Sequence, residues 1–307
     1  PKVPIFEEHV SKYCGSKHVF AVNSATSGLH LACLSLGLKK GDFVWTSPIS
    51  FVASANCALY CGANIDFVDI DKVSYNLSIP QLEAKLKLAE VKGRLPKIII
   101  AVHLSGQPAD MEGIKELSHR YKFKLIEDAS HALGASYKGK KVGSCEFSDL
   151  TIFSLHPVKM ITTGEGGLIT TNDEKLAKKI KSLRSHGINK DTSLMTKSPD
   201  GEWYYEQIDL GFNYRMPDIN AALGISQLKR LDEFIKKREQ LAQYYDFNLK
   251  NLPLKIPIQD SNSISSRHLY IIRIDNEKTN AKHKFIFSQL RDHNIGVNLH
   301  YIPIHLH

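Results

Sequence analysis

Three short segments of this 307-residue chain combine residue types that could do chemistry on a small anionic molecule. The first, residues 23–28 (Asn-Ser-Ala-Thr-Ser-Gly), places hydroxyls and small side chains where a strand should give way to a helix. The free N–H groups of a helix N-terminus attract anions, and small residues let a phosphate approach them. Because Ser and Thr also cap helices that bind nothing, helix capping remains the alternative for this segment.

The second segment has two consecutive acids, Glu127 and Asp128, at the end of an apolar run, with His131 three residues further on. A carboxylate at the end of a buried strand is costly unless a cation or a hydrogen-bond donor faces it. The pair therefore indicates a polar partner. Helix capping and ligand binding both remain open for Asp128.

The third segment is Phe-Ser-Leu-His-Pro-Val-Lys at 153–159, followed by Thr-Thr-Gly-Glu-Gly-Gly at 162–167. It places Lys159 on an otherwise apolar turn that hydroxyls and three glycines close before the next strand. Solvation at the surface is the alternative, since most lysines are exposed.

An anion cradle, an acid at a strand end and a lysine about thirty residues later are the parts that pyridoxal phosphate requires. The helix N-terminus would hold its phosphate, the lysine amine would attach it, and the acid would keep its pyridine nitrogen protonated. The glycine, serine and histidine motifs of nucleotide-binding proteins, serine hydrolases and zinc proteases are missing. The five cysteines lack the paired spacing of zinc sites, so we predict no metal, and a reducing cytoplasm suits them.

The elements that must position these residues alternate along the first two-thirds of the chain, as in an α/β domain with a mostly parallel sheet. Ligands in such sheets bind at the carboxyl ends of the strands, which is where the three segments fall. The predicted strands are 18–22, 43–46, 65–70, 97–103, 123–128, 150–154 and 167–171, and the predicted helices between them are 26–36, 51–61, 79–92, 110–121 and 173–186.

The pattern changes after Pro217. Residues 189–207 before it are polar and predict an irregular excursion. Apolar spacing then predicts one long or bent helix over 218–250. A strand at 268–274, a helix at 281–293 and a strand at 295–300 follow as the start of a small α+β domain. We therefore expect a large cofactor domain (1–217), a connecting helix (218–250) and an incomplete small domain (251–307), in a chain clipped at both ends.

Composition narrows the function classes. Lys and Arg number 40 against 32 Asp and Glu, a net charge of +8 that is spread along the chain and predicts surface charge rather than nucleic-acid binding. No apolar run approaches the roughly 18–20 residues of a membrane span, and no secretory signal is visible. We expect a cytoplasmic protein with small-molecule substrates and neither a nucleic-acid nor a membrane partner.

Six ordered motifs stand out along the chain: VNSATSGLHLA (22–32), SPISFVASAN (47–56), EDASHALGA (127–135), FSLHPVKMITTGEGG (153–167), LRSHGI (183–188) and LGFNYRMPDINAALGISQL (210–228). As a set, they resemble the DegT-type sugar aminotransferases, pyridoxal-phosphate enzymes that act on nucleotide-linked keto sugars. The resemblance extends from the first residue to the last and implies the fold type I, aspartate aminotransferase-like, architecture.

The resemblance implies a role for individual residues around the cofactor. Lys159 would form the Schiff base and then move a proton, Asp128 would pair with the pyridine nitrogen, and Phe51 would stack on the ring. The groups implied to bind the phosphate are Ser24, Ala25, Thr26 and Ser154, together with Asn213 reaching the cofactor of a neighbouring subunit in a homodimer with shared sites. The remaining implied positions are His131 near the cofactor O3′, His156 near the lysine, and Arg215 and His300 as contacts for a diphosphate or a dicarboxylate donor, for which structural roles stay open.

The implied reaction is transamination of a UDP-linked 4-keto-6-deoxy-N-acetylhexose with L-glutamate as the amino donor. Some relatives of this fold carry His in place of the lysine and dehydrate sugars, and Lys159 argues against that branch. The alternatives are an aminotransferase for a dTDP-linked or UDP-bacillosamine-type keto sugar and a non-catalytic regulatory protein of the same fold.

Overall fold

The computed structural model of the chain covers all 307 residues. Seven strands form one sheet in the order β1-β9-β8-β5-β4-β2-β3, in which β9 is antiparallel to both neighbours and all other pairs are parallel. The predicted α/β class and all seven predicted sheet strands are confirmed. The strands are β1 His18–Val22, β2 Phe43–Thr46, β3 Asn64–Phe67, β4 Ile98–Val102, β5 Lys124–Asp128, β8 Leu150–Ser154 and β9 Gly167–Thr171.

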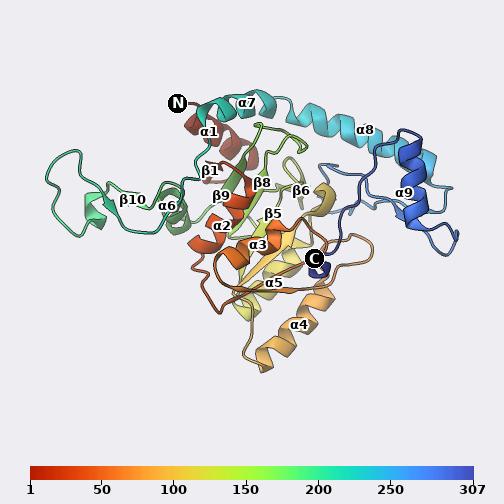
Figure 1. Cartoon of the computed structure of the whole chain (residues 1–307), viewed down its shortest axis with the longest axis horizontal. Helices are drawn as coiled ribbons and strands as arrows, with labels where there is room; N and C mark the ends of the chain where they lie inside the picture. The colour runs from red at the N-terminus through yellow and green to blue at the C-terminus, as the bar shows by residue number, and fades with distance from the viewer.

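Alternation along the central strands decides which layer of helices each side chain meets. On β4, Ile98 and Ile100 belong to the core beneath α2 and α3, whereas Ile99 and Ala101 belong to the core beneath α4 and α5. All five residues of β4 are buried, as expected for a strand covered on both faces. The sheet is therefore the middle of three layers (Figure 1).

The predicted helices of the large domain are all present. A helix that the prediction missed precedes them: α1 buries Phe6, Val10 and Cys14, whose spacing of four residues marks one helical face. The helices are α1 Lys2–Cys14, α2 Ala25–Ser35, α3 Ala53–Tyr60, α4 Ile79–Val91, α5 Met111–Tyr121 and α6 Glu174–Leu183.

The long or bent helix predicted over 218–250 consists of two consecutive helices, α7 Asp218–Leu228 and α8 Leu231–Leu249, which run one after the other along the top of the molecule in Figure 1. α7 packs on α1, and the Asp218 carboxylate accepts the N–H groups of Lys2 and Val3 at 2.7 and 2.9 Å. The break after Leu228 lets α7 remain on α1 while α8 leads toward α9 His283–Asp292.

Three strand predictions need correction. β3 ends at Phe67 rather than 70, because the Asp69 and Asp71 carboxylates accept the N–H groups of the following loop. In the predicted strand 268–274, just the last two residues pair, as β14 Arg273–Ile274 with β12 Leu254–Lys255; the N–H of Leu269 is instead given to Ser105. Residues 295–300 form no strand, since no strand lies beside them to pair.

Short elements complete the fold. β13 Ser263–Ile264 pairs with β6 Ser136–Tyr137, which pairs with β7 Lys140–Lys141, so the C-terminal segment is attached to the body that holds the large sheet. The excursion predicted at 189–207 projects from the molecule (Figure 1) and contains β10 Ile188–Asn189, β11 Glu206–Gln207 and the 3₁₀ turn Thr192–Leu194. The other 3₁₀ turns are Leu104–Gly106 (η1) and Ile304–Leu306.

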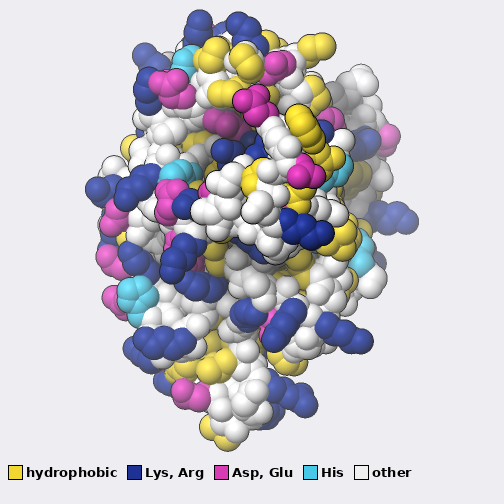
Figure 2. All heavy atoms as spheres, turned by 90° about the vertical axis from the view of Figure 1, so that its left-hand side faces the viewer, with side chains coloured by type: hydrophobic (Ala, Val, Ile, Leu, Met, Phe, Trp, Pro, Cys, Tyr) yellow, Lys and Arg dark blue, Asp and Glu magenta, His cyan; other side chains and the backbone are white.

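Figure 2 shows the face on the side of this excursion, where Lys and Arg lie among acidic and apolar side chains over the whole surface. No continuous cationic groove of the kind that follows a phosphate backbone is visible on this face. None of the helices is both long and apolar enough to span a bilayer.

Candidate active site

A cavity of about 520 Å³ opens at the carboxyl ends of the sheet strands, the edge at which α/β proteins bind ligands. Ten of the twelve site residues predicted from the sequence line it, and they come from five separate parts of the chain. They are Ser24, Ala25, Thr26, Phe51, Asp128, His131, Ser154, His156, Lys159 and His300.

Asp128 ends β5 and is 5% exposed, so its carboxylate needs the donors that surround it. The Ser54 hydroxyl donates to Oδ2 at 2.6 Å, and the Ser130 backbone N–H donates to Oδ1 at 3.1 Å. Ser54 lies in the first turn of α3 and shares a further hydrogen bond with Ser50 at 2.7 Å. These contacts fix the carboxylate at the wall of the cavity.

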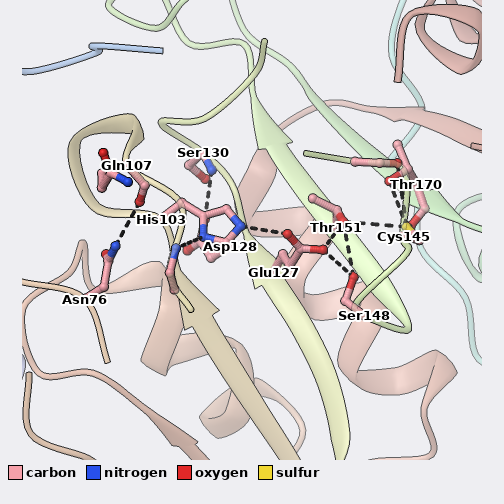
Figure 3. A network of polar contacts seen from close by, with 12 residues as sticks. Asn76, His103, Gln107, Glu127, Asp128, Ser130, Cys145, Ser148, Thr151 and Thr170 are labelled. Carbon is pink, nitrogen blue, oxygen red and sulfur yellow. Dashed lines mark hydrogen bonds and ion pairs between the residues drawn. The ribbon is translucent and has the colours of Figure 1, made fainter. Parts of the chain in front are cut away.

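The other acid of the pair, Glu127, points away from the cavity into a buried network (Figure 3). His103 Nδ1 accepts the N–H of Ala109 at 3.1 Å, so its proton lies on Nε2, which donates to Glu127 Oε2 at 2.7 Å. The hydroxyls of Ser148 and Thr151 donate to Oε1 at 2.5 and 3.0 Å. Burial alone would raise the pKa of Glu127, but these hydrogen bonds, led by that of His103, outweigh it and lower the pKa. The network joins β4, β5 and β8 directly behind Asp128.

Lys159 follows β8 on the turn that the sequence analysis singled out, and its amine has no hydrogen-bond or ion-pair partner within the chain. Burial lowers the pKa of this amine, and the negative charge of Asp128 opposes that effect. The backbone N–H of Lys159 donates to the His156 carbonyl at 2.9 Å, which sets the turn. A partly buried, unpaired amine near a fixed carboxylate is suited to covalent and proton-transfer chemistry.

The anion cradle is the N-terminus of α2. Ser24 caps the helix by accepting the N–H of Ser27 at 3.1 Å, so capping and a cradle coexist in this segment. The N–H groups of Ala25 and Thr26 precede the first intrahelical bond, from Gly28 to the Ser24 carbonyl. A Cβ on Gly167, at the start of β9, would lie 2.6 Å from Ala25 N, so glycine there permits the close approach of β9 to the cradle.

The aromatic residues of the site lie around the same cavity. Phe51 is 58% exposed at its wall. His131 is buried, and burial followed by the charge of Lys159 holds its pKa well below the usual range. The same two causes lower the pKa of His300. His156 is exposed and lies 3.7 Å from the Glu165 carboxylate, Nε2 to Oε1.

Asn213 and Arg215 do not line the cavity of their own chain. Both are exposed, and they form isolated backbone bridges to Ser185 and Val22. The sequence analysis missed several residues that do line it, although more than half of them belong to motifs already quoted. The missed residues are Ser50, Ala53, Val102, Ser130, Glu165, Gly166, His268, Leu269, Asn298 and Tyr301, together with Leu29 and Val158.

The donor set fits pyridoxal phosphate. A helix N-terminus with free N–H groups suits a phosphate, a buried carboxylate suits a protonated pyridine nitrogen, and an unpaired amine suits an aldehyde. The cavity volume is within the about 300–1,000 Å³ of typical small-molecule sites.

Comparison with known proteins agrees with this geometry. Residues 1–307 match the DegT/DnrJ/EryC1/StrS aminotransferase family. A UDP-4-amino-4,6-dideoxy-N-acetyl-beta-L-altrosamine transaminase of Campylobacter jejuni is 45% identical over 98% of this chain and 76% of its own length. A GDP-perosamine synthase of Caulobacter vibrioides is 39% identical over 86% of this chain and 66% of its own length.

Solved structures show the same relationship. An aminotransferase of Helicobacter pylori involved in the biosynthesis of pseudoaminic acid superimposes with a TM-score of 0.86 at 33% identity, over 99% of this chain and 78% of its own. The PLP form of a sugar aminotransferase described as putative from Streptococcus pneumoniae gives 0.88 at 27% identity, over 100% and 79%. The chain belongs to the DegT/DnrJ/EryC1/StrS family and is a pyridoxal-phosphate-dependent sugar aminotransferase.

Proposed function

We propose that this family member transfers the amino group of L-glutamate to a UDP-linked 4-keto-6-deoxy-N-acetylhexose, giving a UDP-4-amino-4,6-dideoxy sugar of the pseudaminic-acid type. The observation that supports catalysis is the pairing of Asp128, held by Ser54 and Ser130, with the unpaired amine of Lys159 on one cavity. The choice of substrate is supported by the 45% identity to the UDP-4-amino-4,6-dideoxy-N-acetyl-beta-L-altrosamine transaminase of Campylobacter jejuni.

Individual residues would hold the cofactor as follows. The N–H groups of Ala25 and Thr26 and the Ser154 hydroxyl would bind its phosphate, with Ser24 shaping the turn. Asp128 would accept a hydrogen bond from its protonated ring nitrogen, and Phe51 would lie against the ring. When bound, pyridoxal phosphate supplies an aldehyde that takes up an amino group and a ring that spreads the charge left by a departing proton.

The remaining steps are proton transfers at protein atoms. Lys159 Nζ is the group able to remove the donor's Cα proton and return it, because its lowered pKa leaves more of the amine neutral near pH 7. His131 and His300 stay neutral in this range because their pKa values are lowered, so they add no positive charge beside that amine. His156 would steady the turn that carries the lysine, since its carbonyl accepts the Lys159 N–H and its Nδ1 accepts the Val158 N–H.

A panel of nucleotide keto sugars tests the reaction. Incubation with glutamate should aminate the UDP-linked 4-keto-6-deoxy-N-acetylhexose in preference to GDP- and dTDP-linked keto sugars, with the product identified by mass spectrometry and NMR. Borohydride should fix the cofactor on Lys159, and Lys159→Ala should be colourless and inactive. Preferred amination of a GDP- or dTDP-sugar would reject the substrate, and an active Lys159→Ala would reject the mechanism.

We further propose a cytoplasmic homodimer whose sites are shared, in which Asn213 reaches the partner's cofactor phosphate. Asn213 is exposed and lies outside its own cavity. The excursion and the residues that follow it expose large apolar side chains, with Trp203 74% and Leu210 83% exposed. The five free cysteines suit a reducing compartment. Within each chain, residues 1–217 would hold the cofactor, 218–250 would connect, and 251–307 would contribute to the small domain.

Subunit mixing tests the shared site. Asn213→Ala and Lys159→Ala should each be nearly inactive. After the two variants are mixed and their subunits exchange, half of all dimers contain one subunit of each kind, and each such dimer holds one intact site of two. The mixture should therefore recover about a quarter of wild-type activity. Sedimentation as a monomer, or no recovery on mixing, would contradict the proposal.

A further inference from the structure

Tyr301 lines the active-site cavity, and its hydroxyl has no role in the functions assigned above. Tyr301 lies in the C-terminal segment, where Asn298 and His300 also line the cavity. Its Oη is 3.2 Å from His131 Nε2. The direction of that hydrogen bond decides whether the hydroxyl proton is free to bind a ligand.

The backbone fixes the tautomer of His131. The N–H of Ser105 donates to His131 Nδ1 at 3.2 Å, so Nδ1 carries a lone pair and not a proton. The imidazole is neutral, because burial and the nearby Lys159 charge hold its pKa well below the usual range. Its proton is therefore on Nε2, which donates to Tyr301 Oη.

The donor itself is held in a strained conformation. Ser105, in η1, has φ 56° and ψ 7°, the left-handed region that non-glycine residues rarely occupy. The Ser266 N–H donates to the Gly106 carbonyl at 3.1 Å, and the Leu269 N–H donates to the Ser105 carbonyl at 3.3 Å. The Ser266 hydroxyl also donates to the His131 carbonyl at 2.6 Å. The C-terminal segment thus maintains the backbone that aims His131 at Tyr301, as is common where strain serves a site.

The hydroxyl hydrogen of Tyr301 consequently has no acceptor within the chain. Oη already accepts from His131, and no side-chain or backbone oxygen of the chain accepts a hydrogen bond from Tyr301. Burial, followed by the charge of Asp128, raises the pKa of Tyr301 to about 12, so the phenol keeps its proton at neutral pH. It is a directed donor on the wall of the cavity.

The neighbouring groups indicate the kind of acceptor. The large-domain elements supply the charged groups and the helix N-terminus suited to the cofactor, whereas the C-terminal segment supplies an amide, an imidazole and a phenol, from Asn298, His300 and Tyr301. Neutral donors of this kind suit the carbonyl and hydroxyl oxygens of a sugar.

We propose that Tyr301, oriented by the Ser105–His131 hydrogen bonds, donates a hydrogen bond to an oxygen of the hexose of the keto-sugar substrate. The proposal rests on the proposed function. It makes Tyr301 a substrate-binding residue and His131 a positioning residue that acts through it.

The test compares the two half-reactions of the full-length, cofactor-loaded protein, followed separately by absorbance, in wild type and Tyr301→Phe. Phenylalanine keeps the ring beside His131 and removes the hydroxyl. The KM for the keto sugar should rise about 5- to 30-fold, and the Kd of the amino-sugar product, measured by calorimetry, should rise with it, while the glutamate half-reaction stays within about twofold. Tyr270→Phe is the matched control, since its hydroxyl donates to Asp246 at 2.7 Å outside the cavity.

Rescue separates positioning from a structural role. Glutamine at 131 can accept from Ser105 and donate to Tyr301, whereas leucine can do neither. His131→Gln should therefore bind the sugar more tightly than His131→Leu, and this difference should disappear in the Tyr301→Phe background.

Two results would overturn the proposal: unchanged sugar KM and product Kd in Tyr301→Phe, or an equal loss in the glutamate half-reaction. The melting temperature of each variant, compared with Tyr270→Phe, shows that it is folded. If wild type aminates no keto sugar, the proposed function fails and this proposal fails with it; if wild type is active and Tyr301→Phe is unaffected, the role of Tyr301 alone fails.

Discussion

The buried network of Glu127 predicts a large difference between two substitutions at one position. In Glu127→Gln the amide oxygen can still accept from His103 Nε2–H, and the amide nitrogen can donate to the Ser148 and Thr151 hydroxyls, which can rotate to accept. The loss is confined to the charge assistance of these hydrogen bonds, about 1–2 kcal/mol. Glu127→Leu leaves the buried His103 donor without a partner, because the Ala109 N–H prevents the proton from moving to Nδ1.

We expect Glu127→Leu to cost about 3–5 kcal/mol, because it removes the acceptor of three buried or part-buried donors and each unsatisfied group costs about 1–3 kcal/mol. The assay is urea unfolding at one saturating cofactor concentration, followed by tryptophan fluorescence in a Trp203→Phe background, which leaves Trp45, 2% exposed, as the reporter. Equal losses for Gln and Leu, or a loss below about 0.5 kcal/mol for Leu, would refute the assigned hydrogen-bond directions.

The pH dependence adds an independent test. The folded state lowers the pKa of Glu127 below its ordinary 4.5, so its ionised form stabilises the fold fully above that value. That stability is lost as the pH falls through the folded pKa. The stability gap between wild type and Glu127→Gln should therefore be constant above about pH 5 and narrow on acidification. A gap that widens toward low pH would show that the pKa is raised instead.

Three further predictions concern the cavity. Gly167→Ala should lower cofactor affinity and the melting temperature, because the new Cβ would lie 2.6 Å from Ala25 N. Gly296→Ala is the control, since its Cβ would meet nothing within 4 Å and should change neither property. Fluorescence titration measures the affinity, and calorimetry measures the melting temperature. In cofactor-free protein, Lys159 should be acylated at lower pH than exposed lysines because its pKa is lowered. Asp128→Asn should shift this acylation to still lower pH, because it removes the negative charge that raises the pKa of Lys159. Peptide mass spectrometry at a series of pH values measures both effects. Ser54→Ala should weaken cofactor binding about tenfold by removing one donor to Asp128, and an unchanged cofactor Kd would contradict the contact at 2.6 Å.

The sequence by itself determined the large sheet and the place of its chemistry. Apolar runs such as Ile98–Val102 must be buried on both faces, so alternating strands and helices specify the parallel layers and leave the strand ends as the ligand edge. Local signals also located Lys159, Asp128 and the Ser24 turn, because turn, cap and strand-end chemistry depend on near neighbours.

The tertiary structure decided everything that depends on distant partners. Glu127 and Asp128 are adjacent in sequence, yet they face opposite ways because successive residues of a strand point to opposite sides: one joins His103, the other Ser54. The predicted strand over 268–274 failed for the same reason, since its Leu269 N–H bonds to Ser105, more than 160 residues earlier. Tyr301 showed no chemical signal of its own in the sequence. That its hydroxyl hydrogen lacks an acceptor became evident when the fold brought Ser105, His131 and the C-terminal segment together. The tautomer of a histidine is set by the partners on both of its nitrogens.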